Sequence, residues 1–166
     1  SAGTCFSSGD GAGILGFTAP FILTLPLLNW MPEEIDSALQ RILPELAGKT
    51  DINILLSHLG LPTDRYLAEH YPELHVIIGA HTHHLLEHGE KRGNSLIAAT
   101  GRYGDHIGRI ELEIEDGKLV HMQARTVVTD DLPAVHEDEI EIAGYQTSGE
   151  QQLAKRVIAD LPTAYT

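Results

Sequence analysis

Apolar residues in the first half of the chain alternate between short continuous runs and helically spaced positions. Three short apolar runs, at 13–18, 51–56 and 74–78, predict buried strands. Between them, apolar residues three to four positions apart predict helices over 33–46 and 62–71. The order strand, helix, strand, helix, strand predicts parallel strands joined by crossover helices.

The second half of the chain changes to a two-residue period. One strand is predicted at 94–100. Apolar and polar residues then alternate through 107–115 and 118–129, on either side of Asp116-Gly117, a dipeptide that favours a tight hairpin turn. The predicted fold class is therefore α/β, with parallel strands and crossover helices followed by antiparallel hairpin strands.

The 166 residues have room for one ordinary domain. We expect residues 1–12 to be a disordered or artificial start and residues 13–130 to form the domain. The segment 131–147 is densely acidic, which predicts a solvated linker. Helically spaced apolar residues predict a helix within 148–166.

The net charge of −13 argues against a nucleic acid or an anionic membrane as partner, because both attract basic surfaces. A phosphorylated substrate would then need a local positive group, such as a metal ion. Cys5 is the only cysteine, so the chain forms neither an internal disulfide nor a cysteine-rich zinc site. No apolar run has the length of a membrane span.

Histidines directly follow two of the predicted parallel strands. His58 comes after the strand at 51–56, and His81 and His83 follow the strand at 74–78. In open α/β sheets, ligands gather at the carboxyl ends of parallel strands, so we expect these side chains to converge. Imidazole suits zinc, iron, manganese and nickel. The pattern therefore predicts a metal site at this edge of the sheet.

Other polar residues near these loops have open roles. His84 and His106 either support the ligands or are merely polar, and Arg102 either approaches an anionic substrate or is a surface residue. The remaining histidines are interpreted as structural or solvent-exposed: His70, His75, His88, His121 and His136.

Three runs of the sequence resemble a known family. Asn-Ile-Leu-Leu-Ser-His-Leu-Gly (53–60), followed by Asp64 and by Val-Ile-Ile-Gly-Ala-His-Thr-His-His (76–84), is similar to the later motifs of the calcineurin-like metallophosphoesterases. The similarity is to the bacterial 5′-nucleotidase and UDP-sugar hydrolase branch, which Ala-Thr-Gly-Arg-Tyr-Gly-Asp-His-Ile-Gly-Arg-Ile-Glu-Leu (99–112) also resembles. It spans roughly residues 13–129.

The resemblance implies a fold, a cofactor and a reaction. The fold would be the second half of a catalytic domain built as a four-layer α/β/β/α sandwich. The cofactor would be two divalent metal ions (Mn, Zn, Fe, Co or Mg), with His58 and His81 on one ion and His83 on the other. The reaction would release phosphate from nucleotides through a metal-bound hydroxide. Ala80 stands where the family usually has a second glycine.

The family's earlier motifs are missing from this chain: an Asp-x-His strand end, a bridging Asp, and an Asn-His pair that carries the catalytic histidine. Asp10 imitates the bridging Asp but lies too close to the next strand. Three imidazoles do not complete two metal shells, since each shell needs about four ligands. We therefore expect no hydrolysis by this chain alone. The resemblance also implies that the helix within 148–166 is a connector helix toward a separate C-terminal substrate-binding domain in the intact protein.

Two other functions fit part of the pattern. Amidohydrolase barrels also place His-x-His after a strand, but they do so early in the chain and without the hairpins that follow here. A degenerate or interaction module without catalysis would explain the missing ligands, and an incomplete sheet would favour self-association.

For the phosphoesterase interpretation, the expected partner is a small-molecule nucleotide. Localisation stays open between the cytoplasm and an extracytoplasmic compartment.

Overall fold

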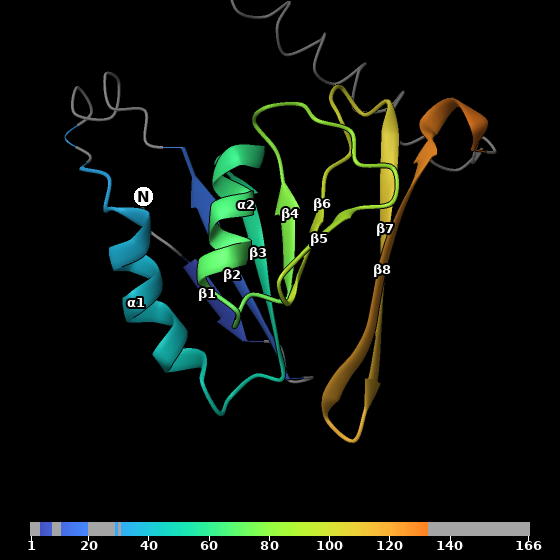
Figure 1. Cartoon of the computed structure of the whole chain (residues 1–166). Coiled ribbons are helices and arrows are strands. Elements are labelled where there is room, and N and C mark those ends of the chain that lie inside the picture. The colour runs from blue at the N-terminus through green and yellow to red at the C-terminus, as the bar shows by residue number, and fades with distance from the viewer. Residues whose placement is uncertain (1–3, 8–10, 20–28, 30, 133–166) are drawn as a thin grey trace, which may run out of the picture. The chain divides into compact units, whose positions relative to one another are not determined.

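The computed structural model of the protein describes residues 4–7, 11–19, 29 and 31–132. It contains a six-stranded sheet in the order β1-β2-β3-β4-β6-β5 and a two-stranded sheet of β7 and β8 (Figure 1). All described elements belong to the first of two compact units, Ser1–Asp131, and of the second unit, Leu132–Thr166, only Leu132 is described. The elements in chain order are β1 (Thr4–Ser7), β2 (Ala12–Thr18), α1 (Ile35–Leu46), β3 (Ile52–His58), α2 (Leu61–His70), β4 (Val76–Gly79), β5 (Glu90–Arg92), β6 (Ser95–Ala98), β7 (His106–Glu115), β8 (Lys118–Val128) and the 3-10 helix η2 (Thr129–Asp131).

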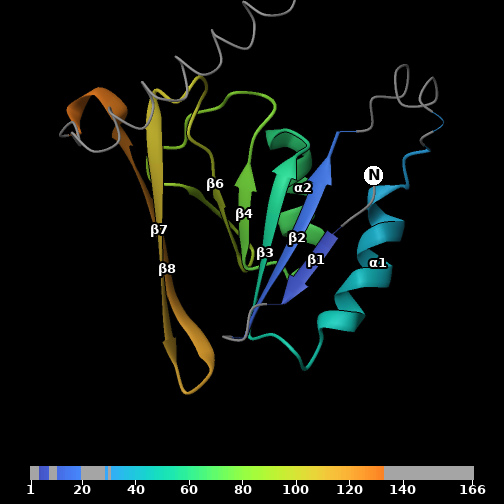
Figure 2. The same ribbon diagram turned by 180° about the vertical axis from the view of Figure 1, so that it is seen from behind.

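Strands β2, β3, β4 and β6 are parallel neighbours in that order, which confirms the predicted parallel layer. Helix α1 connects β2 to β3, and α2 connects β3 to β4. The last residues of β2 and β3, Thr18 and His58, are register partners. The carboxyl ends of the parallel strands therefore lie side by side, as the view from behind the helices shows (Figure 2).

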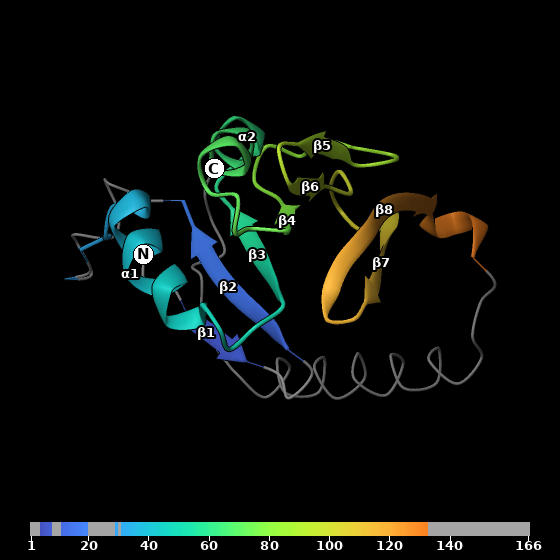
Figure 3. The same ribbon diagram turned by 60° about the horizontal axis from the view of Figure 1, so that its bottom comes forward.

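The two helices cover one face of the large sheet (Figure 3). Leu15, Leu55 and Ile77 point to that face, are fully buried, and pack in one cluster with apolar residues of α1 and α2. Because side chains alternate along a strand, the neighbouring residues point to the other face. There Leu56 is 46% exposed and Ile78 is 40% exposed. No helix in the described part of the chain covers this second face.

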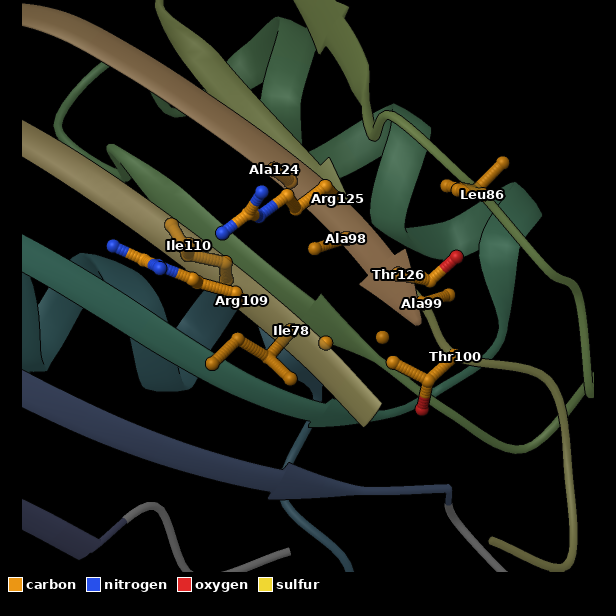
Figure 4. Close-up of a pocket in the computed structure, with 12 residues that line it drawn as sticks. Ile78, Leu86, Ala98, Ala99, Thr100, Arg109, Ile110, Ala124, Arg125 and Thr126 are labelled. Carbon is orange, nitrogen blue, oxygen red and sulfur yellow. The ribbon is translucent and has the colours of Figure 1, made fainter. Parts of the chain in front are cut away.

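Strands β7 and β8 form the predicted hairpin around Asp116-Gly117, and both turn residues have positive φ. The hairpin contacts the large sheet through a small cluster in which Ala124 packs against Leu96 and Ala98. A cavity of about 130 Å³ remains between hairpin and sheet (Figure 4).

Two strands were not predicted. Thr4–Ser7 form β1, antiparallel to β2, so the expectation of a start without regular structure is wrong for these residues. The reason is tertiary, because the open edge of β2 offers unpaired backbone groups whatever the local composition. Strand β5 pairs with β6 through the two-residue turn Gly93-Asn94, a hairpin signal present in the sequence. The predicted acidic linker at 131–147 lies outside the described residues, except for its first two residues. The predicted connector helix within 148–166 lies entirely outside them.

None of the helices in the described part of the chain has the length and apolar character needed to cross a bilayer.

Glu90 joins helix α2 to the edge of the large sheet. Its carboxylate accepts hydrogen bonds from Arg65 of α2, with an Nη2–Oε2 distance of 2.7 Å, and from Arg92 of β5, with an Nε–Oε1 distance of 2.6 Å. Arg92 also pairs with Glu69 of α2 at 3.0 Å. The hydrogen bonds from Arg65, together with those from Arg92, lower the pKa of Glu90 to about 2.

The substitution Glu90→Gln should therefore destabilise the fold at neutral pH. Because the folded-state pKa lies below the ordinary value of 4.5, the ionised pair stabilises the fold above about pH 4.5, and this contribution is lost as the pH falls toward 2. After allowance for solvent screening, we expect a loss of about 1–2 kcal/mol in the free energy of unfolding at pH 7. Urea unfolding at pH 7 and at pH 3 measures it. Glu33 provides the control, because its carboxylate pairs with Arg41 at 2.8 Å in an exposed position, and Glu33→Gln should change little. An equal effect of Glu90→Gln at both pH values would contradict the assignment.

Candidate functional site

His58 is the last residue of β3, at the carboxyl edge of the parallel strands. Its backbone oxygen accepts a hydrogen bond from the Ala19 N–H at 3.0 Å, which keeps the ends of β2 and β3 together. His58 lies on the same sheet face as Leu56 and borders an open cavity of about 440 Å³. Cavities of this size accommodate small-molecule ligands. The cavity is lined by Gly16, Phe17, Thr18, Leu56, Ser57, His58, Ile78 and Ala80.

The structure brings His81 against His58. The His81 Nδ1 and His58 Nε2 atoms lie 3.3 Å apart, and the two rings meet edge to face with centroids 4.9 Å apart. His81 is positioned two residues after the end of β4 and has a φ of +74°. The two imidazoles therefore come together from separate strand ends.

The separation of the two ring nitrogens fits a shared cation. Two imidazole nitrogens bound to one ion at 2.0–2.1 Å, with a near-tetrahedral angle between the bonds, lie roughly 3.3 Å apart. Among the described residues, however, no group of three or more His, Cys, Asp or Glu side chains is placed to hold an ion. The pair thus fits as part of a metal site and does not form a full set of ligands.

His83 has different surroundings. Its ring centroid lies 6.1 Å from that of Tyr103, and the guanidinium carbon of Arg102 lies 4.9 Å from the Tyr103 ring centroid. The structure therefore places His83 beside the turn that follows β6, while His58 and His81 form a separate pair. A role of His83 on a second ion stays a prediction.

The loops at this edge contain strained backbone. His81, His83 and Tyr103 all have φ between +56° and +74°, a region that residues other than glycine rarely adopt. Such conformations cost of order 1–3 kcal/mol each and persist where the surrounding structure imposes them. Tyr103 is also 83% exposed, so burial of its ring does not explain the conformation.

Thr82 connects the loop of residues 80–84, the histidine loop, to helix α2 through a hydrogen bond. Its Oγ1 accepts a hydrogen bond from the Leu61 N–H at 3.1 Å and lies 2.8 Å from His84 Nδ1. Gly60 packs so closely that a Cβ there would lie 2.8 Å from the Thr82 methyl carbon. His84 is thus placed within the loop's hydrogen bonds, whereas His106 begins β7, paired with Val128. Asp10 lies outside the described residues.

Asp64 is a buried carboxylic acid beneath this edge, and its position in the site was not predicted from the sequence. It is 1% exposed; the Ser57 hydroxyl donates a hydrogen bond to its Oδ1, and its Oδ2 has no partner among the described residues. Burial raises the pKa of Asp64 to about 6, against the opposing effect of the Ser57 hydrogen bond. A signal existed in the sequence, because Asp64 shares the inward face of α2 with Leu61, Leu67 and Ala68.

No protein-family model matches the chain. The uncharacterized metallophosphoesterase YunD of Bacillus subtilis is 35% identical over 108 residues, which are 65% of this chain and 23% of that protein. Protein 5NUC of Lutzomyia longipalpis is 33% identical over 89 residues, 51% of this chain and 15% of that protein.

Solved structures share the fold. The 5′-nucleotidase precursor of Thermus thermophilus matches 95% of this chain and 36% of its own, with a TM-score of 0.68 and 22% identity. The sulfate thiohydrolase SoxB of the same species matches 91% of this chain and 29% of its own, with a TM-score of 0.64 and 22% identity. Over part of its length, this chain is homologous to a metallophosphoesterase.

The relationship covers part of each relative, since the chain spans between about a seventh and a quarter of the two sequence relatives. The α/β architecture, with a parallel sheet followed by antiparallel hairpin strands, is that of a metallophosphatase fold, as predicted. In this chain, the two strand ends that carry His58 and His81 form the candidate site.

The raised pKa of Asp64 predicts that Asp64→Asn stabilises the fold at neutral pH. Because the folded-state pKa of about 6 lies above the ordinary value of 3.8, the protonated carboxyl stabilises the fold below pH 4, and this advantage is lost as the pH rises through 6. At pH 7.5 the neutral amide avoids the burial of a charge, so we expect a gain of about 2 kcal/mol in the free energy of unfolding. Urea unfolding at pH 7.5 and pH 4 tests this. A gain of the same size at both pH values would show that burial of the charge is not the cause.

Proposed function

We propose that this chain contributes part of a two-cation phosphate-ester hydrolase, with nucleotides as the substrate class. The observation that carries the proposal is the His58–His81 pair, with ring nitrogens 3.3 Å apart at the carboxyl edge of a parallel sheet. The homology to a metallophosphoesterase supports hydrolase chemistry, and the shared fold with a 5′-nucleotidase precursor supports nucleotides. When bound, divalent cations would polarise the phosphate ester and activate the attacking water.

The proposed roles follow from the surroundings of each side chain. His58 Nε2 and His81 Nδ1 face each other and would hold one cation. His83 is proposed for a second cation. The Arg102 guanidinium stacks on Tyr103 beside His83, and no carboxylate in the described part of the chain forms an ion pair with it. In a protein with a net charge of −13, Arg102 would provide a local attraction for an anionic phosphate.

An interaction module without catalysis is a second candidate. It is favoured by the missing third ligand among the described residues and by the partial exposure of Leu56 and Ile78 on the sheet face that no described helix covers. Binding of a cation at the histidine pair separates the two proposals, because a module that only packs against a partner has no need of it.

Cation binding to the chain tests the pair directly. We expect Co²⁺ to bind weakly at pH 7.5, and His58→Ala or His81→Ala to weaken binding about tenfold or more, because each removes one of two ligands. Cobalt absorption and isothermal titration calorimetry measure the affinity. His121→Ala is the matched control, since His121 lies on the hairpin strand β8. Equal affinities for all four proteins would exclude a cation at the pair.

Hydrolysis tests the larger claim. The 166-residue chain should not hydrolyse AMP or p-nitrophenyl phosphate above background with Mn²⁺ or Co²⁺, because its described residues hold no complete ligand set. Expression of the full reading frame that encodes these residues should give metal-dependent release of phosphate from AMP. His81→Ala should reduce that activity at least about a hundredfold, and His121→Ala should not. Turnover by the 166-residue chain that His81→Ala abolishes would show that the site is complete without further residues.

A further inference from the structure

Asp64 is the buried group that the proposed function does not use. It lies on the first turn of α2, and its Oδ2 has no partner among the described residues. A buried carboxylate oxygen without a partner lowers stability, and groups of this kind are concentrated at functional sites. The first question is therefore what the carboxyl group touches.

The carboxyl group touches both strands that deliver the histidine pair. Its Oδ1 accepts the hydrogen bond of Ser57, the residue before His58. Its Oδ2 lies 2.5 Å from the position that a Cβ on Gly79 would take, and Gly79 stands two residues before His81. Ser57 and Gly79 are register partners at the ends of β3 and β4. One carboxyl group therefore contacts each strand where it leads into its histidine loop.

The same turn of α2 also contacts the histidine loop itself. The Leu61 N–H donates to Thr82 Oγ1, and Gly60 packs against Thr82 and the His81 ring. A Cβ on Gly60 would lie 3.6 Å from His81 Cδ2. Asp64 thus belongs to the helical turn that lies against the histidine loops after β3 and β4. Its carboxyl group is buried inside the fold.

We propose that Asp64 is a positioning residue that sets the separation of the His58 and His81 rings through Ser57 and Gly79. The inference rests on the proposed function for the use of the pair, but the ring separation is measurable without any cation. Burial raises the pKa of Asp64 to about 6, which agrees with a carboxyl group held in place at the expense of stability. Gly79 leaves the space that Oδ2 occupies.

The test measures the ring pair in the metal-free chain by NMR. Wild type should show an NOE between ring protons of His58 and His81, whose centroids are 4.9 Å apart. Asp64→Asn retains an oxygen that accepts the Ser57 hydrogen bond and should retain the NOE. Asp64→Leu has a similar branched shape without an acceptor, and Ser57→Ala removes the donor, so both should lose most of the NOE intensity. Asp116→Asn removes one carboxylate at the hairpin turn and should change nothing.

A second measurement is the affinity of the same proteins for Co²⁺ alone. Residues that orient metal ligands typically change the affinity 10–100-fold when altered. We expect that loss for Asp64→Leu and Ser57→Ala, and none for Asp64→Asn or Asp116→Asn. If the Asp64 side chain only filled space, Asp64→Leu and Asp64→Asn would have the same affinity for Co²⁺, because leucine fills the space that asparagine fills. Circular dichroism establishes that each variant is folded, and Ser57→Ala decides the test if Asp64→Leu does not fold.

The outcomes separate the two proposals. Loss of the NOE in Asp64→Leu and Ser57→Ala, with no Co²⁺ binding by wild type, supports the positioning role and removes the cation from the proposed function. Folded variants that keep the NOE and the wild-type affinity for Co²⁺ overturn the positioning role and leave the cation site intact. Absence of the NOE in wild type overturns the positioning role as well.

Discussion

The parallel pairing of β3 with β4 is the constraint on which the candidate site depends. The ladder runs from Ile54 paired with Val76 to Ser57 paired with Gly79. Because parallel strands end at the same edge, the residues that follow each strand emerge together, although 23 positions separate His58 from His81 in the sequence. A shift of this register by one residue would turn His58 toward the helix-covered face, since successive side chains point to opposite faces.

The large core cluster keeps that register in place and offsets the unfavourable features at the edge. Leu55 and Ile77 are fully buried under the helices, and each buried side chain of this size contributes about 1.5–3 kcal/mol. Against this stand the positive φ values of His81 and His83 and the buried carboxyl group of Asp64. The positive φ values of His81 and His83 and the buried acid thus occur together at the ends of β3 and β4, although other described residues, such as Asp116 in the hairpin turn, also have positive φ. This is the distribution expected where local structure serves a site.

Homology and geometry support different parts of the proposed function. The sequence relatives support metallophosphoesterase ancestry over part of the chain, and the solved structures support the architecture. The ring nitrogens of His58 and His81 add a local distance that suits one cation, and the 440 Å³ cavity beside His58 adds space for a small substrate. Leu56 and Ile78 remain partly exposed on the face that no described helix covers, so this part of the fold leaves apolar surface available for packing.

The sequence by itself determined the elements whose signals are local. Helical spacing gave α1 and α2, the apolar runs gave the parallel strands, and Asp116-Gly117 gave the hairpin, because each pattern reflects burial or turn geometry within a few residues. It also indicated that His58 and His81 would converge, since parallel strands end at the same edge of a sheet. Only the tertiary structure decided the rest. Strand β1 depends on the free edge of β2, His83 is directed toward Tyr103 by loop backbone, and Asp64 acquires its surroundings from Ser57 and Gly79 on two other elements. Such contacts join residues distant in the chain, and no local pattern of polarity encodes them.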